Sequence, residues 1–319
     1  MAIVTLSLNP TIDVSSETDR VLPTHKIRTA NEQYEAGGGG VNVARVIIEL
    51  GGWAKVICPA GGFSGQMLDE LLGAEPVPRR IVPIAGRTRI SFTVFERKTG
   101  NEFRFTPNGP KISASELAAC LDAVRAEDFD YLVASGSVPM GAPTDILAQV
   151  AEIVAAKGAR FVLDSSGAGL SVTLERGHTY LVKPSLSEME AMFGRRLDDE
   201  TVQEAATSLV NQGRAEIVAV TMGAAGALVV TRDKTLRVLS PKVDVRSAVG
   251  AGDAFVGAMT LALSQGRPLE EAVMFATAAG AAATLTPLAK VCTVDDVARL
   301  EAQVMRENAA IMNRQAQTR

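Results

Sequence analysis

The sequence has too few histidines for several common kinds of catalysis. Only His25 and His178 occur among 319 residues, and neither a GxSxG nor an HExxH motif is present. A Ser-His-Asp triad or a histidine-based metal site would have to use one of these two residues. The patterns GxGxxG and GxxxxGK[ST] are also missing, which argues against a dinucleotide fingerprint and a Walker A loop. We therefore expect an enzyme that does not depend on histidine, and a nicotinamide-dependent oxidoreductase is disfavoured.

Cysteine, positive charge and long apolar runs are also scarce. The three cysteines, Cys58, Cys120 and Cys292, lie far apart, which argues against structural zinc and for a reducing compartment. A net charge of -4 provides no general field for nucleic acid. The longest apolar run, residues 272–285, is shorter than the roughly 18 residues of a membrane span. No basic stretch precedes the apolar N-terminal residues, so we expect no secretory signal and predict a cytoplasmic enzyme.

The apolar content of 47% is enough for a sizeable core, and the pattern along the chain predicts an α/β fold. From residue 130 onward, short apolar runs alternate with glycine-containing turns and amphipathic helices. This order predicts a mostly parallel sheet that is covered by helices on both faces. We expect residues 1–10, 37–86 and 107–319 to form this main domain.

Two segments, residues 11–36 and 87–106, break this pattern. Residues 11–36 are polar and irregular, whereas residues 87–106 alternate around a turn at Lys98–Asn101. The alternation predicts a half-buried antiparallel hairpin. Together the two segments are expected to form a small projecting sheet that acts as a lid or a dimer contact. The alternative is an ordinary meander at the edge of the main sheet.

The strongest local signal for chemistry is Gly250-Ala251-Gly252-Asp253, which leads into an apolar helix. Glycines allow the backbone to approach a ligand closely, and a helix start offers unpaired N–H groups to an anion. A carboxylate beside such a site can take a proton from an attacking hydroxyl while the site stabilises a transferring phosphoryl group. The alternative is that Asp253 only caps the helix.

Three weaker patterns accompany this one. The run Gly37–Gly40, followed by Asn42, exposes bare backbone to a polar ligand, although a flexible turn explains it equally well. Lys183, Ser185 and Glu188 follow an expected strand. In the functional interpretation, Lys183 lies near a nucleotide phosphate and Glu188 lies near a hydrated magnesium ion. The spacing of Ser185 and Glu188 also fits a capping box. Residues 220–227 form a glycine turn suited to phosphate or ribose.

These pieces occur in the order and spacing of the ribokinase-like sugar kinases of the PfkB family, which the sequence resembles over nearly its whole length. The blocks GGGGVNVAR and GAGD followed by Phe-Val-Gly carry the resemblance, together with the TLSLNPTIDV opening. The resemblance implies a three-layer αβα domain with a mostly parallel central sheet and a small β-sheet lid. It also implies an ATP- and magnesium-dependent kinase and a homodimer that associates through the lid.

The resemblance also implies roles for individual residues. Asp253 is the expected base, and Gly250, Ala251 and Gly252 donate N–H groups to the γ-phosphate. The residues expected to hold the acceptor sugar phosphate are Asp13, Lys26, Gly38, Gly39, Asn42, Arg89 and Ser137. Those expected to line the ATP–magnesium side are Lys183, Ser185, Glu188, Thr221, Gly223, Gly226, Thr277, Gly280 and Ala281, with Glu188 serving the metal. Arg28, Arg87 and Arg104 add positive charge to the projecting segments, and for Arg87 and Arg104 a solvated face is the expected setting.

Within the family, the sequence is most similar to the branch that phosphorylates fructose 6-phosphate at its 1-hydroxyl. The 1-phosphofructokinase and tagatose-6-phosphate kinase branches usually carry a lysine in the glycine block, where this sequence has Gly39 and Gly40. Both activities remain alternatives, as does a non-catalytic sugar-phosphate sensor. Ser185 and Ala248 replace the asparagine and threonine that are usual in the family.

Some members of the family bind a monovalent cation in the loop that corresponds to residues 286–290. Here this loop reads Thr-Pro-Leu-Ala-Lys, without a flexible glycine or a side-chain amide. Lys290 is expected to take the place of the cation, so we do not expect potassium dependence.

Overall fold

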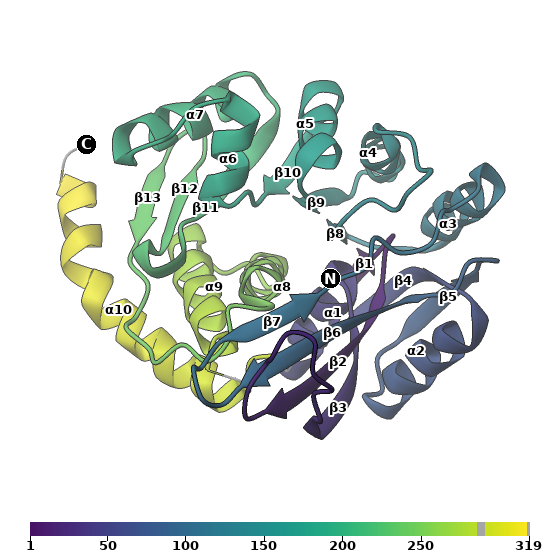
Figure 1. Cartoon of the computed structure of the whole chain (residues 1–319). Coiled ribbons are helices and arrows are strands. Elements are labelled where there is room, and N and C mark those ends of the chain that lie inside the picture. The colour runs from purple at the N-terminus through teal and green to yellow at the C-terminus, as the bar shows by residue number, and fades with distance from the viewer. Residues whose placement is uncertain (286–290, 318–319) are drawn as a thin grey trace.

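The computed structural model describes residues 1–285 and 291–317, which form two sheets and two layers of helices (Figure 1). The large sheet has nine strands in the order β13-β12-β11-β10-β9-β8-β1-β4-β5. They are β1 (Ile3–Leu6), β4 (Ala54–Ala60), β5 (Arg79–Pro83), β8 (Tyr131–Ser135), β9 (Arg160–Asp164), β10 (Thr179–Val182), β11 (Ala215–Thr221), β12 (Ala227–Val230) and β13 (Thr235–Val238). All neighbours from β11 to β5 are parallel, and only β12 and β13 pair antiparallel. Because both faces are covered, the central strands are almost uninterrupted apolar runs.

The helices form one layer on each face of this sheet (Figure 1). One layer contains α1 (Gly39–Glu49), α2 (Gly62–Ala74), α8 (Ala251–Ser264), α9 (Leu269–Ala283) and α10 (Val294–Gln317). The other contains α3 (Ala114–Ala126), α4 (Ile146–Ala156), α5 (Gly167–Arg176), α6 (Leu186–Phe193) and α7 (Asp199–Asn211). Two separate clusters of buried apolar side chains fill the spaces between the sheet and these layers. The expected three-layer αβα fold with a mostly parallel sheet is confirmed.

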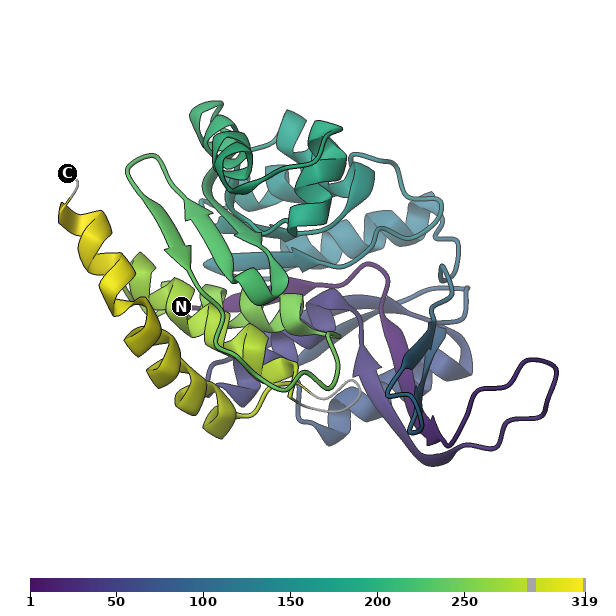
Figure 2. The same cartoon turned by 60° about the vertical axis from the view of Figure 1, so that its left-hand side comes forward.

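A second, four-stranded sheet with the order β3-β2-β6-β7 lies beside the large one. Its strands are β2 (Thr11–Thr18), β3 (Ala30–Gly37), β6 (Arg89–Glu96) and β7 (Glu102–Phe105). The antiparallel hairpin predicted in residues 87–106 is present as β6 and β7. Figure 2 shows this small sheet projecting from the body, with the connection between β2 and β3 extending beyond it. We call these four strands and their connections the small sheet.

Strand pairing gives the small sheet two different faces. Tyr34, Val14, Phe92 and Phe105 lie directly opposite one another across the four strands, so they form a single apolar row. Side chains alternate along a strand, so the residues next to these in sequence belong to the opposite face. That opposite face is polar and includes Asp13 on β2.

No helix in the described part of the chain has the length and apolar character that a membrane crossing requires.

Candidate active site

The centre of the site lies where three neighbouring parallel strands end. Ser135 is the last residue of β8, Asp164 is the last residue of β9, and Lys183 follows β10 directly. The Lys183 ammonium is 3.0 Å from Asp164 Oδ1, and Ser135 Oγ donates a hydrogen bond of 3.0 Å to Asp164 Oδ2. Carboxyl ends of parallel strands meet at one edge of the sheet, which is where ligands bind in open α/β folds. Asp164 and Ser135 were not expected from the sequence.

Asp253 lies in the first turn of α8, above this edge. The helix begins after Gly250, whose φ of 77° is in the left-handed region that suits glycine, and no side chain caps it. The first helical bond runs from the Ala254 N–H to the Gly250 carbonyl. The N–H groups of residues 251–253 therefore have no partner within the helix and can receive an anion. The alternative interpretation of Asp253 as a cap is wrong.

Two polar side chains lie against the Asp253 carboxylate, and the single proton of Ser135 can point to either Asp164 or Asp253. Asn42 Nδ2 donates to its Oδ2 at 2.9 Å, and Ser135 Oγ lies 3.4 Å from its Oδ1. Burial, with the nearby charge of Asp164, raises the pKa of Asp253 to about 7, although Asn42 and Lys183 act in the opposite direction. A carboxylate that exchanges its proton near neutral pH is suited to general base catalysis.

Lys183 supplies positive charge below the start of α8. Its side chain is buried, and burial alone would lower its pKa, but the charge and hydrogen bond of Asp164, together with the charges of Glu188 and Asp253, outweigh this effect and the pKa is raised. A Cβ placed on Gly252 would lie 3.5 Å from Lys183 Nζ, so the ammonium is close to the free N–H groups of α8. The start of α8 and the Lys183 ammonium together form an electropositive site that can bind a phosphate.

A cavity of about 480 Å³ opens beside the start of α8. Six of the nine residues that the sequence predicted for the nucleotide side line it: Thr221, Gly223, Gly226, Thr277, Gly280 and Ala281. Ala251 and Gly252 also line it, so it is continuous with the anion site. At Gly226, with φ at 89°, a Cβ would lie 2.0 Å from the Val238 carbonyl oxygen, so the turn requires glycine. The cavity is large enough for a drug-sized ligand.

Sequence reasoning missed a whole wall of this cavity. Ala224, Ala227, Ala248, Phe255 and Thr284, which lie in or beside the sequence motifs, also line the cavity. The lining residues outside these motifs are Ser240, Pro241, Lys242, Val243 and Val245. They lie in residues 240–248, between β13 and α8, where the chain forms neither a helix nor a strand. Such a segment has no periodic pattern from which its position can be predicted.

Ser185 and Glu188 form a capping box at the start of α6. Ser185 Oγ accepts from the Glu188 N–H at 3.3 Å, and Glu188 Oε2 accepts from the Ser185 N–H at 2.7 Å. The capping alternative is therefore confirmed, and Ser185 is absent from the cavity lining. The charge of Glu188 nevertheless contributes to the raised pKa of Lys183, which places this carboxylate near the anion site. Its magnesium role stays a prediction.

The glycine block forms the other side of the site. Gly39 and Gly40 begin α1, so the block is not merely a flexible turn. A Cβ at Gly39 would lie 2.3 Å from Ser135 Oγ, and one at Gly38 would lie 2.9 Å from Pro10 Cα. The bare backbone of these residues therefore packs against β8 and the loop after β1, and brings Asn42 to Asp253.

Asp13 faces the glycine block from the small sheet. A Cβ at Gly37 would lie 1.9 Å from Asp13 Oδ2, so only glycine leaves room for this carboxylate. Burial raises the pKa of Asp13, and the charges of Arg104 and Arg89 oppose this rise. Arg104 is exposed, as expected, yet it is the positive charge with the largest effect on Asp13.

Arg89 and Ser137 are connected through Asn9, a residue that sequence reasoning did not single out. Arg89 Nη2 donates to the Asn9 carbonyl at 2.7 Å, and Asn9 Nδ2 donates to Ser137 Oγ at 3.0 Å. Asn9 Nδ2 also donates to the Asn108 carbonyl at 3.0 Å. A second bond of 3.0 Å, to the Pro107 carbonyl, holds the Arg89 guanidinium. Asn9 therefore links the two groups expected to bind the acceptor phosphate.

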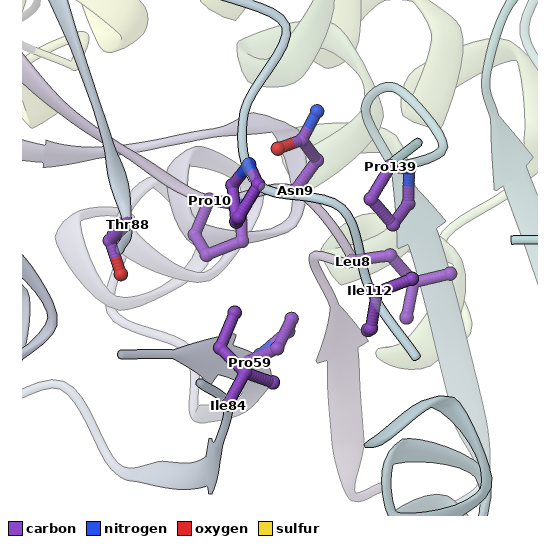
Figure 3. A pocket seen from close by; sticks show the side chains of 9 residues that line it. Leu8, Asn9, Pro10, Pro59, Ile84, Thr88, Ile112 and Pro139 are labelled. Atoms are coloured by element: carbon purple, nitrogen blue, oxygen red, sulfur yellow. The ribbon is translucent and has the colours of Figure 1, made fainter. Parts of the chain in front are cut away.

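A small apolar cavity lies behind Asn9 (Figure 3). Its volume of about 10 Å³ is no larger than the space of a single water molecule. Pro10, Pro59, Ile84 and Pro139 are among its walls, and Figure 3 shows them around the space beside Asn9. This cavity is a gap in the packing rather than a place for substrate.

Two expectations remain outside the assembled site. Lys26 is exposed in the connection between β2 and β3, so its role at the acceptor phosphate stays a prediction. The loop of residues 286–290, including Lys290, lies outside the described residues, so the expectation about potassium stays a prediction. The other expected site residues lie at the sheet edge, at the start of α8, at the glycine block or around the large cavity, except Asp13 and Arg89, which lie on the small sheet.

A near-neutral carboxylate next to an anion-binding helix start is what phosphoryl transfer to a hydroxyl requires. Fold and site thus define the class of small-molecule kinases. Residues 4–296 match the model of the pfkB family carbohydrate kinases, and the chain belongs to this family. It is a sugar kinase, and the resemblance found in the sequence is confirmed.

Proteins of known activity are similar over almost the whole chain. The ATP-dependent 6-phosphofructokinase isozyme 2 of Mycobacterium tuberculosis (strain ATCC 25618 / H37Rv) is 43% identical, over 93% of this chain and 88% of that protein. Phosphofructokinase-2 from Escherichia coli in complex with substrates and products superimposes with a TM-score of 0.92 at 38% identity, over 95% of this chain and 99% of that one. The same protein in complex with potassium gives a TM-score of 0.91 at 39% identity, with the same coverage.

Proposed function

We propose that the chain transfers the γ-phosphoryl group of ATP to the 1-hydroxyl of fructose 6-phosphate, which gives fructose 1,6-bisphosphate and ADP. The observation that carries this proposal is the position of Asp253. Its carboxylate lies between the large cavity, which is suited to a nucleotide, and the glycine block, which is suited to a sugar. The acceptor is proposed from the similarity to 6-phosphofructokinases over almost the whole chain.

In this proposal Asp253 accepts the proton of the 1-hydroxyl as its oxygen attacks the γ-phosphorus. The bond between that phosphorus and the bridging oxygen of ADP breaks on the opposite side. The N–H groups of residues 251–253 and the Lys183 ammonium stabilise the negative charge on the transferring group. Positioning and electrostatics lower most of the barrier, as is usual for phosphoryl transfer.

Magnesium fits the oxygen donors near the anion site. No group of three or more His, Cys, Asp or Glu side chains in residues 1–285 and 291–317 is arranged as a complete metal site. Magnesium needs only one or two carboxylates, because it keeps several waters and binds phosphate oxygens. Glu188 is the carboxylate that would hold it through water. When bound, the ion neutralises charge on the nucleotide phosphates.

The packing of the glycine block supports fructose 6-phosphate over the alternative acceptors. A lysine at position 39, as is usual in the 1-phosphofructokinase and tagatose-6-phosphate kinase branches, would have to displace Ser135 and the Gly136 backbone. Ser135 also contacts the base, so this displacement would disturb Asp253. A non-catalytic sensor would have no need for the near-neutral carboxylate.

We place the 6-phosphate of the acceptor at Arg89 and Ser137. Arg89 donates to two main-chain carbonyls, and burial lowers its pKa, although the charge of Asp13 opposes this effect. A phosphate dianion compensates for burial of a guanidinium better than carbonyl oxygens do. Lys26, which is exposed, stays a predicted member of this set.

We propose a homodimer that forms through the apolar face of the small sheet. Tyr34, Phe92 and Phe105 in the apolar row are 46%, 49% and 60% exposed. Three large apolar side chains in a row on one exposed face are typical of an interaction site. Phe92→Asp should yield monomers in light scattering, whereas a wild-type enzyme that is monomeric at assay concentration would contradict the proposal.

The sequence of residues 286–290 also leads us to propose that activity does not require potassium. Replacing potassium by tetramethylammonium should leave kcat unchanged, and a large loss of activity would overturn this proposal. Cys58, Cys120 and Cys292 are free and buried, which supports activity in the reducing cytoplasm.

The function is tested by measuring ADP release from magnesium-ATP with fructose 6-phosphate, tagatose 6-phosphate and fructose 1-phosphate, each supplied alone. We expect a clear preference for fructose 6-phosphate in kcat/KM. Preference for another acceptor would keep the kinase and overturn its substrate. The absence of turnover with all three would overturn the proposed acceptor class.

A further inference from the structure

A hydrogen bond connects the small sheet to the segment that leads into the anion site. Ser247 Oγ donates to Glu102 Oε2 at 3.1 Å, although the two residues are 145 positions apart. Glu102 is the first residue of β7, and Ser247 lies three residues before Gly250. Ser247 is only 4% exposed, so water does not readily replace this bond. The mechanism described above uses neither residue.

The Ser247 hydroxyl also shapes the chain just before α8. It accepts a hydrogen bond of 3.2 Å from the Val249 N–H, next to the left-handed Gly250. A hydroxyl has one proton, so donation to Glu102 leaves its lone pairs free for Val249. A carboxylate acceptor makes the first bond charge-assisted and strengthens the second. Glu102 therefore influences the backbone that positions the free N–H groups of residues 251–253.

The same strand also reaches the acceptor side. Arg104 is two residues beyond Glu102, so both side chains belong to the polar face of the small sheet. Arg104 is the positive charge with the largest effect on Asp13, which faces the glycine block. One short strand thus carries one side chain toward the proposed sugar site and another toward the proposed phosphoryl site.

We infer that Glu102 and Ser247 form a latch that couples binding of the acceptor to the arrangement of the anion site. Both are positioning residues, because neither touches the reacting atoms. This inference rests on the proposed function. An acceptor that holds β7 in place holds Ser247, and the ordered segment then presents its N–H groups to the γ-phosphate. Coupling between two sites is reciprocal, so each substrate strengthens binding of the other by the same factor.

The latch is tested by isothermal titration with a non-hydrolysable ATP analogue and magnesium, with and without saturating fructose 6-phosphate. In the wild type, we expect the sugar phosphate to tighten analogue binding at least about fivefold. In Glu102→Ala and in Ser247→Ala, the sugar phosphate should change analogue binding less than about twofold. Glu102→Gln keeps an acceptor oxygen and should restore most of the coupling.

Glu32→Ala is the matched control. Glu32 is exposed on β3 of the same sheet and accepts a hydrogen bond from Thr29, so its loss should leave the coupling unchanged. The double variant Glu102→Ala/Ser247→Ala should behave like Ser247→Ala, because that single variant already removes both the bond to Glu102 and the bond from the Val249 N–H. Thermal unfolding of each variant separates loss of coupling from loss of folding.

Wild-type coupling in Glu102→Ala would overturn the latch, as would a wild-type factor of one. A wild type that does not phosphorylate fructose 6-phosphate contradicts the proposed function instead. In that case the same titrations with the acceptor that it does phosphorylate decide on the latch.

Discussion

The two sides of the active site differ in the side chains that form them. The large cavity on the nucleotide side is lined mainly by small or apolar residues on the main domain, such as Gly280, Ala281 and Thr277. The acceptor side is lined by charged and amide side chains, and two of them, Asp13 and Arg89, come from the small sheet. Binding on the nucleotide side depends on the shape of the cavity. Binding on the acceptor side depends on charged groups that hydrogen bonds hold in position.

This difference indicates how each side is held in the conformation that binds its substrate. The cavity is built on α8, α9 and the turn after β11, which pack into a large buried core, so it is present before any ligand binds. The acceptor side exists only where a strand of a projecting sheet meets the glycine block. We therefore expect changes on the nucleotide side to act through shape and changes on the acceptor side to act through charge and position.

The largest effect is expected where the two sides meet, at Asp253. Asp253→Asn keeps the shape and removes the base, so kcat should fall at least about a hundredfold. The KM values of both substrates should change little, because the walls of both sides remain. Steady-state kinetics measure both quantities, and near-normal turnover would show that another group accepts the proton.

Two variants, one on each side of the site, should affect different substrates. Gly280→Val adds methyl groups to a position whose Cβ would already lie 3.2 Å from the Ala251 carbonyl oxygen. It should raise KM for ATP about 10- to 100-fold, the usual range for filling a packed site, and leave KM for the acceptor unchanged. Arg89→Ala should raise KM for the acceptor by a similar factor, because charge-assisted bonds are lost, and leave KM for ATP unchanged.

The wild-type enzyme, titrated with each substrate at saturation of the other, is the reference for both variants. Equal increases in the two KM values for either variant would show that the two sides are not separately built. That result would indicate that the shared edge of the sheet binds both substrates as a single site.

A smaller effect is expected at Asn9, which acts on the acceptor side only through its neighbours. Asn9→Ala removes the bonds to Ser137 and the Asn108 carbonyl, so KM for the acceptor should rise about three- to tenfold with kcat unchanged. Asn108→Ala is the control, because Asn108 contributes its main-chain carbonyl and the bond from Asn9 is kept. An equal increase in both variants would assign the effect to the loop rather than to Asn9.

The parts that the sequence predicted are those that carry local patterns. Apolar strands alternating with helices predicted the three-layer fold, and the glycine blocks predicted both helix starts at the site. The position of Asp253 in the first turn of a helix was predicted because an acid after two glycines is a recognisable arrangement, and its role as the base stays a prediction. The capping box of Ser185 and Glu188 was likewise visible as an alternative.

The parts that the sequence did not predict depend on contacts between distant segments. Asp164 and Ser135 lie close to Asp253 only because β8 and β9 are neighbours in the sheet. The order of strands in a sheet cannot be predicted from a local sequence pattern. The contact of Glu102 with Ser247 requires the small sheet to lie beside the start of α8. Residues 240–248 have no periodicity, and so their place in the cavity wall could not be foreseen.

We have proposed that the Asp253 carboxylate, with its pKa raised to about 7, is the base. Catalysis needs Asp253 in its ionised form, and its pKa is raised to about 7, so activity should be lost as the pH falls below that value. The dependence of kcat/KM on pH reports the pKa of the free enzyme. We expect kcat/KM for fructose 6-phosphate to rise about tenfold per pH unit and to level off near pH 7.

The acceptor phosphate, with a second pKa of about 6, also titrates in this range, and one variant separates the two. Asn42→Ala removes a hydrogen bond that lowers the pKa of Asp253, so the inflection should move to higher pH. The measurement to make is therefore the pH profile of kcat/KM, from about pH 5.5 to 8.5, for the wild type and Asn42→Ala. An upward shift in the variant is the predicted result. A flat profile, or an inflection that stays in place, would contradict Asp253 as the base.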